Sequence, residues 1–435
     1  MNKLLLLIVS LLISFVLKAQ TDLIISEYVE GWSTNKAIEI FNPTATAINL
    51  KDYQLVRYAN GEDIPPAADD WKVVLPDAVL EPYKTFVCVI DKRNPEGTGQ
   101  EAPIWKQLEV RADAFLCANY AISNTLYHNG DDAIALEKTN GKLVDLFARW
   151  GEPRPAEAII GGSALKARCW TDTAPYFNGT GAGITADHTL VRKASVVTGV
   201  IVNPTLFNPL EQWDSLSANT FDHLGWHKSN VSPANQTPVF SQESYTFKVW
   251  KQATNGAKLG KAIATDTESD KLKFYINSGN FIYNDNKTED AADDVRLTPF
   301  QINKETGELT VADASSFQYS KNDTVYMSIS VNDGFSETNW ITVIAVLSES
   351  QVGKETVKTG QFSIYPNPVL DQVNLVSEKQ MKTVSVMNVA GQMLIQKEVT
   401  GNKASINLAE ITTGVYFIEA QFNDGSKELQ RMVKK

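Results

Sequence analysis

The stretch VYMSISV, residues Val325–Val331, decides the fold class of this 435-residue chain. Its apolar residues, two valines with Met327 and Ile329 between them, alternate strictly with tyrosine and serine. Successive side chains of a β-strand point to opposite faces of the sheet, so this alternation predicts a half-buried strand. Such a strand pairs with others in a sheet, and the same pattern recurs along most of the chain.

Similar alternation predicts further strands at Ala37–Phe41, Tyr53–Tyr58, Thr85–Ile90, Ala133–Leu136, Tyr245–Val249, Ile341–Val346, Val384–Val389 and Val415–Phe422. Pairs that favour tight turns separate them, namely Asn60-Gly61, Asn129-Gly130, Asn140-Gly141, Asp333-Gly334 and Asp424-Gly425. No stretch has the pattern of a long amphipathic helix. The sequence therefore predicts an all-β protein.

The N-terminus has the pattern of a secretory signal peptide. Lys3 precedes an almost unbroken apolar run, Leu4–Leu17, which is followed by Lys18, Ala19 and Gln20. A bilayer-spanning helix needs roughly 20 apolar residues, which is longer than this run. We therefore expect residues 1–19 to be removed on export. The net charge of −11 and the lack of a basic stripe argue against a nucleic-acid partner.

Changes in composition predict three domains after the signal peptide. Seven of the nine tryptophans precede residue 230, and the polar segment SNVSPANQTP follows them. A second polar segment, residues 348–360, contains no aromatic residue. We predict domains at 20–228, 229–347 and 361–435, the last two joined by the linker 348–360. The three cysteines, Cys88, Cys117 and Cys169, allow one disulfide and a free thiol, or three buried thiols.

The C-terminal region contains four ordered motifs: FSIYPNPVLDQVNL from Phe362, VSVMNVAGQML from Val384, TTGVYFIEA from Thr412, and the terminal RMVKK. They resemble the type A C-terminal sorting domain of the type IX secretion system of Bacteroidetes. The matching motif residues are Pro366, Asn367, Pro368, Gly391, Gly414 and Tyr416. The resemblance implies recognition by the secretion machinery, removal of the domain, and attachment of the mature protein to the outer cell surface through lipopolysaccharide.

The first domain resembles a lamin-tail domain, which is an immunoglobulin-like β-sandwich. The resemblance rests on DLIISEYVEG from Asp22, KAIEIFNPTATAINLKDYQLVRY from Lys36, NGDDAIALEKTNGKLVDLF from Asn129 and EQWDSLSANTFDHLGWH from Glu211. The stretches 63–72, 92–116 and 151–186 have the character of insertions. In bacteria such domains often accompany extracellular nucleases or phosphatases, but this chain has no such partner domain.

The middle domain resembles a cadherin-like repeat in the segments TPVFSQESYTFKV, AIATDTESDKLKFYI, FQINKETGELTV and VYMSISVNDG. The resemblance implies a calcium site with ligands Asp266, Glu268 and Asp333. Calcium takes six to eight oxygen ligands. The linker offers Asn235 and Gln236 in place of acidic residues, so a solvated acidic turn is the alternative interpretation.

No motif of a known catalytic centre is present, which favours a protein that is not an enzyme. One alternative is a metal-dependent hydrolytic site, of the nuclease or phosphatase type, built from Glu27, Glu30, Glu39 and Asp131; the simpler interpretation is exposed carboxylates at strand ends. Trp32, Trp71, Trp105 and Trp150 lie near predicted loops. We expect most of them to be core residues, and the alternative is stacking on a sugar or on partner side chains.

The leading hypothesis is therefore a secreted, surface-attached binding or adhesion protein without catalytic activity, composed of tandem immunoglobulin-like β-sandwiches. Its ligand would be an extracellular protein or polysaccharide. The alternatives are a metal-dependent hydrolase, an accessory subunit of one, or a spacer within a surface assembly.

Overall fold

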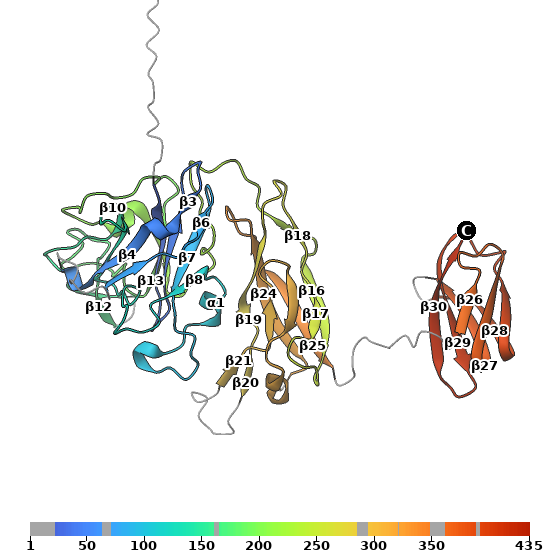
Figure 1. Cartoon of the computed structure of the whole chain (residues 1–435). Helices are drawn as coiled ribbons and strands as arrows, with labels where there is room; N and C mark the ends of the chain where they lie inside the picture. Colours follow the sequence, from blue (N-terminus) through green and yellow to red (C-terminus); the bar gives the residue numbers. More distant parts are fainter. Residues whose placement is uncertain are drawn as a thin grey trace, which may run out of the picture. The chain divides into compact units, whose positions relative to one another are not determined.

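The computed structural model describes residues 22–62, 71–160, 165–284, 295–320, 322–348, 362–388 and 392–435 (Figure 1). The predicted signal peptide, nearly all of the predicted linker and Gly391 lie outside these ranges. The chain divides into two compact units, residues 1–349 and 350–435. The larger unit has separate hydrophobic cores in its first and middle domains. The predicted boundary between these two domains, near residue 228, stays a prediction.

Two sheets enclose the core of the first domain. The larger has the order β14 (Trp213–Ser217), β13 (His188–Arg192), β1 (Ile24–Glu30), β2 (Lys36–Phe41), β7 (Thr85–Ile90) and β8 (Ala114–Leu116). The smaller has the order β10 (Leu143–Phe147), β9 (Ala133–Lys138), β4 (Tyr53–Tyr58) and β5 (Lys72–Val74). β3 (Ile48–Asn49) pairs with β6 (Val79–Leu80). The core between the sheets includes Trp170 and Trp213, both almost fully buried.

The stretches predicted as insertions add small elements to this sandwich. The stretch 92–116 forms η4 (Gly99–Glu101), α1 (Lys106–Glu109) and β8, which extends the larger sheet in parallel with β7. The hairpin of β11 (Glu157–Ile159) and β12 (Lys166–Arg168) lies within 151–186. Other short helices are η1 (Leu50–Asp52), η2 (Ala59–Gly61) and α2 (Pro209–Gln212).

The middle domain is a second β-sandwich. Its four-stranded sheet has the order β16 (Ser244–Trp250), β25 (Ile341–Ser348), β24 (Thr324–Asn332) and β19 (Lys273–Gly279), with β16 and β25 parallel. A three-stranded sheet has the order β17 (Lys258–Lys261), β23 (Glu308–Val311) and β22 (Phe300–Ile302). β15 (Val239–Phe240) pairs with β18 (Ala264–Thr265), and β20 (Ile282–Asn284) with β21 (Val295–Leu297). The short helix η6 (Ala314–Tyr319) follows β23.

β24 contains the stretch that predicted the fold class. Met327 and Ile329 are buried in the core and Tyr326 is exposed, as the alternation predicts. Ser330 departs from the pattern because it is also fully buried. Its hydroxyl donates to Glu337 Oε1 and accepts from Asn277 Nδ2 at 2.7 Å. The outer face of this end of the strand is therefore covered, and the residues that cover it come partly from the first domain.

The second unit is a five-stranded sandwich around its own core. Its strands are β26 (Phe362–Tyr365), β27 (Gln372–Asn388), β28 (Met393–Asn407), β29 (Gly414–Phe422) and β30 (Lys427–Lys434). The long strand β27 pairs with β26, β28 and β29, and β29 also pairs with β30. The predicted all-β fold of sandwiches in tandem is thus confirmed for the described residues.

The cysteines follow the second of the two predicted alternatives. Cys88, Cys117 and Cys169 are free and buried. Burial raises the pKa of the Cys169 thiol to about 12. A raised thiol pKa keeps the sulfur protonated and unreactive, so these residues act as small apolar side chains.

Candidate functional site

Arg111, in the insertion between β7 and β8, connects the first domain to the middle domain. Its side chain is 1% exposed, and its guanidinium donates to both carboxylate oxygens of Glu337, at 2.6 and 2.9 Å. It also donates to Asn277 Oδ1 at 2.6 Å and to the Leu224 carbonyl at 3.0 Å, and it lies over the ring of Tyr275 at 3.9 Å. The Arg111 and Glu337 side chains are 1% and 4% exposed, so the two domains share a buried polar joint.

Two further sets of charged contacts cross the same joint. Lys84 of the first domain pairs with Asp270 at 3.0 Å and donates to the Asp333 carbonyl. Asp113 lies 3.3 Å from the Lys273 ammonium and 3.6 Å from that of Lys304. These pairs are partly exposed and add less than the Arg111 contacts, because solvent screens them.

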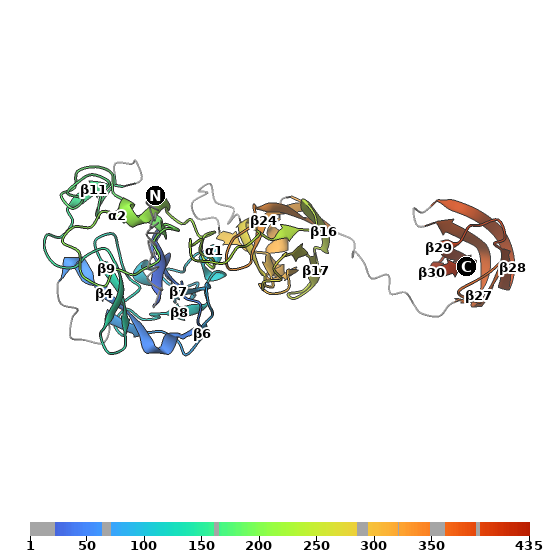
Figure 2. The ribbon, with the colours of Figure 1, turned by 90° about the horizontal axis from the view of Figure 1, so that it is seen from above.

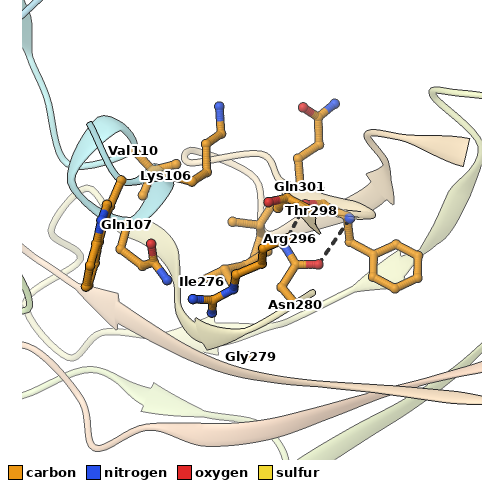
Figure 3. Close-up of a pocket in the computed structure, with 12 residues that line it drawn as sticks. Lys106, Gln107, Val110, Ile276, Gly279, Asn280, Arg296, Thr298 and Gln301 are labelled. Carbon is orange, nitrogen blue, oxygen red and sulfur yellow. Dashed lines mark hydrogen bonds between the residues drawn. The ribbon is translucent and has the colours of Figure 1, made fainter. Parts of the chain in front are cut away.

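Beside this joint lie two cavities that share the residues Trp105, Gln107 and Arg296. Their volumes are about 330 and 350 Å³, at the lower end of the range for ligand pockets. Helix α1 contacts β19 and lines one side (Figures 1 and 2). Figure 3 shows the side chains of Gln107 and Arg296 extending into the space between α1 and the strands of the middle domain. We call the two cavities together the interdomain groove.

Exposed tryptophans flank the interdomain groove. Trp105 lines both cavities and Trp340 lines one of them, with exposures of 42% and 47%. Trp32, which is 55% exposed, contacts Trp105 edge to face, with ring centroids 5.9 Å apart. Trp105 in turn contacts Phe221 edge to face. Large aromatic rings at the rim of a cavity are typical of binding sites, because they supply contact area at a low entropic cost.

Two asparagines hold the backbone of this aromatic group in place. Asn35, 1% exposed, accepts from the Trp105 backbone N–H at 2.9 Å and donates to Asn219 Oδ1 at 3.0 Å. Asn219 Oδ1 also accepts from the Trp32 backbone N–H at 3.1 Å. The Asn219 backbone is left-handed, with φ of 60°, a conformation that asparagine tolerates better than most residues. Both tryptophans are therefore preorganised while their rings stay exposed.

The remaining groove residues supply unpaired polar groups. The side chains of Gln107 and Thr298 make no hydrogen bond with any described residue, and the Asn219 Nδ2 atom is buried without a partner. Arg296 has no acidic partner in the described ranges, and its guanidinium lies over the ring of Phe281 at 4.1 Å. The interdomain groove thus combines exposed aromatic faces with free amide, hydroxyl and guanidinium groups.

Most of this site was not predicted. For all four tryptophans near predicted loops, stacking on a ligand was the alternative to a core position. Trp150 packs against the core and stacks on Tyr58 at 4.3 Å, and Trp71 lies under Arg57. Trp32 and Trp105 are exposed, so the prediction that most of the four are core residues is wrong. The residues Gln107, Arg111, Asn219, Arg296 and Trp340 carried no signal beyond their position in insertions or turns.

The predicted calcium ligands do not line the interdomain groove. Asp333 accepts from Asn235 Nδ2 at 2.9 Å and from the backbone N–H groups of Phe335 and Ser336, both at 2.7 Å. Glu268 accepts from the Gln236 backbone N–H at 3.3 Å. Within the described ranges no three His, Cys, Asp or Glu side chains are grouped to hold a metal ion. The three carboxylates do not form a metal centre by themselves.

The four carboxylates of the alternative hydrolytic site are buried, so the simpler interpretation of exposed strand ends is wrong. Glu27, Glu30, Glu39 and Asp131 are at most 6% exposed. Glu27 and Glu30 lie on β1 and Glu39 on β2, and both strands are buried along their whole length. The four carboxylates also separate into two places: Glu30 pairs with Lys36 and Asp131 with Arg154 at one cavity, while Glu27 and Glu39 are direct cross-strand neighbours elsewhere. The structure does not bring the four together.

The Glu27 and Glu39 pair resists ionisation. Glu39 accepts from Ser26 Oγ and from the Gly225 backbone N–H, both at 2.6 Å, whereas neither carboxyl oxygen of Glu27 has a hydrogen-bond partner. Burial, followed by the neighbouring charges of Glu39 and Asp222, raises the pKa of Glu27 well above its usual range. Burial raises the pKa of Glu39 to about 8. The folded protein therefore binds protons here that the unfolded chain releases.

This pair predicts that stability falls as the pH rises. Both carboxyls have folded pKa values above their unfolded values, so their contribution is complete below about pH 4.5 and declines as the pH rises. The contribution of Glu39 is lost as the pH rises through its folded pKa of about 8. We expect the free energy of unfolding to decrease by a few kcal/mol, as an order of magnitude, between pH 5 and 9. Glu27→Gln should raise stability at pH 8 and flatten this decrease, measured by urea unfolding at each pH.

A matched control for this prediction is Glu305→Gln. Glu305 is exposed, and its hydrogen bond with Lys271 lowers the pKa of its carboxyl. Between pH 5 and 9 this carboxyl is therefore ionised in both the folded and the unfolded chain, so the substitution should leave the slope of stability against pH unchanged in that range. Equal slopes for the wild type and Glu27→Gln would show that Glu27 is ionised alike in the folded and unfolded states.

The described sorting-motif residues connect the two ends of the second unit. The Asn367 amide donates to the Arg431 carbonyl at 2.9 Å, and its oxygen accepts from the Val433 backbone N–H at 2.9 Å. Pro366 and Pro368 flank this asparagine in the turn between β26 and β27. Tyr416 is buried, and its hydroxyl donates to the Thr412 carbonyl at 2.8 Å. A Cβ on Gly414 would meet the Tyr416 ring only at ordinary contact distance.

Comparison with known families agrees with these features. Residues 17–151 match the Lamin Tail Domain family, and residues 363–435 match the Secretion system C-terminal sorting domain family. The lamin-tail match ends well before residue 228, so the later strands of the first domain lie outside it. No curated protein sequence is significantly similar to the chain.

Cadherin structures are among the similar solved structures. The third cadherin domain of human protocadherin 7 is 13% identical and covers 28% of this chain and 96% of its own. Two human structures each cover 46% of this chain: CDH23 EC21-23, 14% identical over 68% of its own length, and protocadherin-24 EC1-2, 13% identical over 99%. All three have a TM-score of 0.20. This value is too low to show a common fold, so the assignment of the middle domain as a β-sandwich rests on its own strands.

The family matches establish a lamin tail domain and a C-terminal sorting domain in this chain. The sorting domain indicates interaction with the type IX secretion system and export to the cell surface or the medium. Of the helices in the described ranges, none is long and apolar enough to cross a membrane.

Proposed function

We propose that this chain is an exported binding protein that takes an extracellular ligand in the interdomain groove and acts without catalysis. The observation that carries the proposal is the preorganised pair of exposed tryptophans, Trp32 and Trp105, beside two adjoining cavities. Contiguous exposed apolar surface with polar residues around it marks an interaction site. A network that fixes the backbone but leaves the rings in solvent prepares them for such a partner.

The location proposed for this activity is the outer cell surface. In this proposal the signal peptide and the sorting domain are both removed, and lipopolysaccharide anchors the mature chain. The larger unit keeps both of its cores when residues 350–435 are removed. The interdomain groove lies entirely within that unit, so processing leaves it intact.

The binding activity is tested by retention of extracellular polymers on the immobilised protein. The panel should include polysaccharides, a glycoprotein and an unglycosylated matrix protein. We expect at least one of them to be retained by the wild type and lost in Trp105→Ala. The matched control is Tyr326→Ala, which removes an aromatic ring that is 61% exposed on β24. Retention that is equal in both variants, or turnover of a polymer that one carboxylate substitution abolishes, would contradict the proposal.

A second, weaker binding activity concerns calcium at Asp266, Glu268 and Asp333. Two buried oxygens there, Asp266 Oδ2 and Asn235 Oδ1, lack a hydrogen-bond partner, and calcium accepts both carboxylate and amide oxygens. Because few carboxylates are available, we propose an affinity in the range of extracellular modules, about 0.1–1 mM. The remaining ligands would be amide and backbone oxygens.

This site predicts a small stabilisation by calcium. At a tenfold excess over the dissociation constant, binding adds about 1.4 kcal/mol to the free energy of unfolding. We expect 10 mM calcium to raise the Tm of the full chain by a few degrees relative to chelator, and Asp266→Asn to abolish the rise. Identical Tm values with calcium and with chelator would exclude the site.

A further inference from the structure

We infer that the ligand of the interdomain groove is an oligosaccharide, bound with sugar rings stacked on Trp105 and its hydroxyls held by Gln107 and Thr298. This inference rests on the proposed binding function and names its ligand class. One face of a hexose ring carries mainly C–H groups and packs on an aromatic ring, while its rim carries hydroxyls that both donate and accept hydrogen bonds. The interdomain groove offers both kinds of surface.

The aromatic part of the site has the geometry that stacking requires. The Trp32 ring meets the Trp105 ring at 83°, and the Trp105 ring meets Phe221 at 88°. In such a contact the edge of one ring packs against the face of the other, which fixes the two rings relative to each other. Trp105 is still 42% exposed with these neighbours in place. It therefore presents a supported aromatic surface at the cavity wall that Gln107 and Arg296 also line.

The polar part of the site favours hydroxyl groups over a charged ligand. Gln107 offers both a donor and an acceptor, and Thr298 offers a hydroxyl. Neither side chain makes a hydrogen bond with a described residue, so both are available to ligand hydroxyls. The charged residues that line the cavities are Lys106, Arg111, Arg296 and Asp222. Lys106 pairs with Glu109 and Arg111 with Glu337, which leaves Arg296 against Asp222. This mixture gives no strong preference for a cation or an anion.

An extended peptide is the competing ligand, because β19 is an edge strand and lines the interdomain groove. Addition of a peptide strand needs a regular row of free backbone groups. The register of β19 shifts between Ile276 and Ser278, where the pairing with β24 is irregular. Bulges of this kind protect an edge from pairing. Helix α1 also contacts β19, which limits access to its free edge. These two features favour the oligosaccharide.

The test uses the full chain and an array of soluble oligosaccharides of four to six sugars, covering glucose, galactose, mannose and N-acetylhexosamine series. The best binder is then measured by titration calorimetry. We expect Trp105→Ala to weaken its affinity at least tenfold. Gln107→Ala should weaken it several-fold, because the Gln107 amide has no partner among the described residues and is free to bind the ligand. Trp105→Phe should restore part of the loss, and Tyr326→Ala should change the affinity less than twofold.

The outcomes separate this inference from the proposed function. If an unglycosylated protein is retained and its retention needs Trp105, while no oligosaccharide binds or competes, the ligand class is wrong and the binding function stands. If no polymer and no oligosaccharide binds, both fail. If thermal unfolding shows that the wild type and Trp105→Ala are both folded and an oligosaccharide binds them equally, the sugar site lies elsewhere and the inference is wrong.

Discussion

Deleting residues 362–435 should abolish transport of the chain to the cell surface in a host that has a type IX secretion system. The deleted region is the sorting domain, and it forms a compact unit with its own core. The two cores of the larger unit do not depend on it. The shortened chain should therefore accumulate in the periplasm as a folded protein. Protease treatment of whole cells measures this directly, since only surface protein is cleaved.

Two further variants show whether the sorting domain acts as an independent signal. Residues 350–435 fused to a fluorescent protein with a signal peptide should carry that protein to the surface. Asn367→Ala removes two hydrogen bonds that fasten the turn to β30, each worth about 1 kcal/mol, and should reduce export. Leu429→Ala, at an exposed position of β30 outside the four motifs, is the matched control. Surface display of the deleted chain at the wild-type level would contradict the assignment of this domain as the export signal.

The strands were predictable because their signal is local. Tyr53–Tyr58 and Thr85–Ile90 have the predicted bounds, and the strand predicted at Val325–Val331 extends by one residue at each end. Period-2 patterning reports which side chains face a core, and it needs no knowledge of distant segments. The exception at Ser330 is informative, because its burial depends on Glu337 and Asn277 rather than on its own strand.

The groove and the joint were not predictable, because they depend on contacts between segments that are far apart in the sequence. Arg111 and Glu337 are 226 residues apart in the sequence, and neither lies in a recognisable motif. Glu27 and Glu39 were expected at exposed strand ends because carboxylates are seldom buried. They are buried because β1 and β2 are interior strands of the six-stranded sheet and are buried along their whole length. Long-range covering of a polar face leaves no trace in local patterning.

Arg111→Ala is expected to be the most destabilising single substitution at the joint between the first and middle domains. It leaves the Glu337 carboxylate buried, 4% exposed, without its cation. Breaking a buried ion pair in this way costs about 3–5 kcal/mol. The loss also removes the packing of the guanidinium on Tyr275. We expect the larger unit, which should unfold in one calorimetric transition in the wild type, to show two transitions in this variant.

Three comparisons separate the ion pair from a general loss of packing. Lys271→Ala breaks an exposed pair with Glu305 and should cost less than about 1 kcal/mol. Replacing both Arg111 and Glu337 by leucine removes both charges together and should recover most of the stability that Arg111→Ala loses. Arg111→Lys keeps the charge but cannot donate to both carboxylate oxygens and to Asn277 and Leu224 at once, so it should fall between the two. If the double leucine variant is as unstable as Arg111→Ala, shape rather than charge holds the joint together. The insertion that contains both Trp105 and Arg111 would then be held against the middle domain by its packing and not by the charge of its arginine.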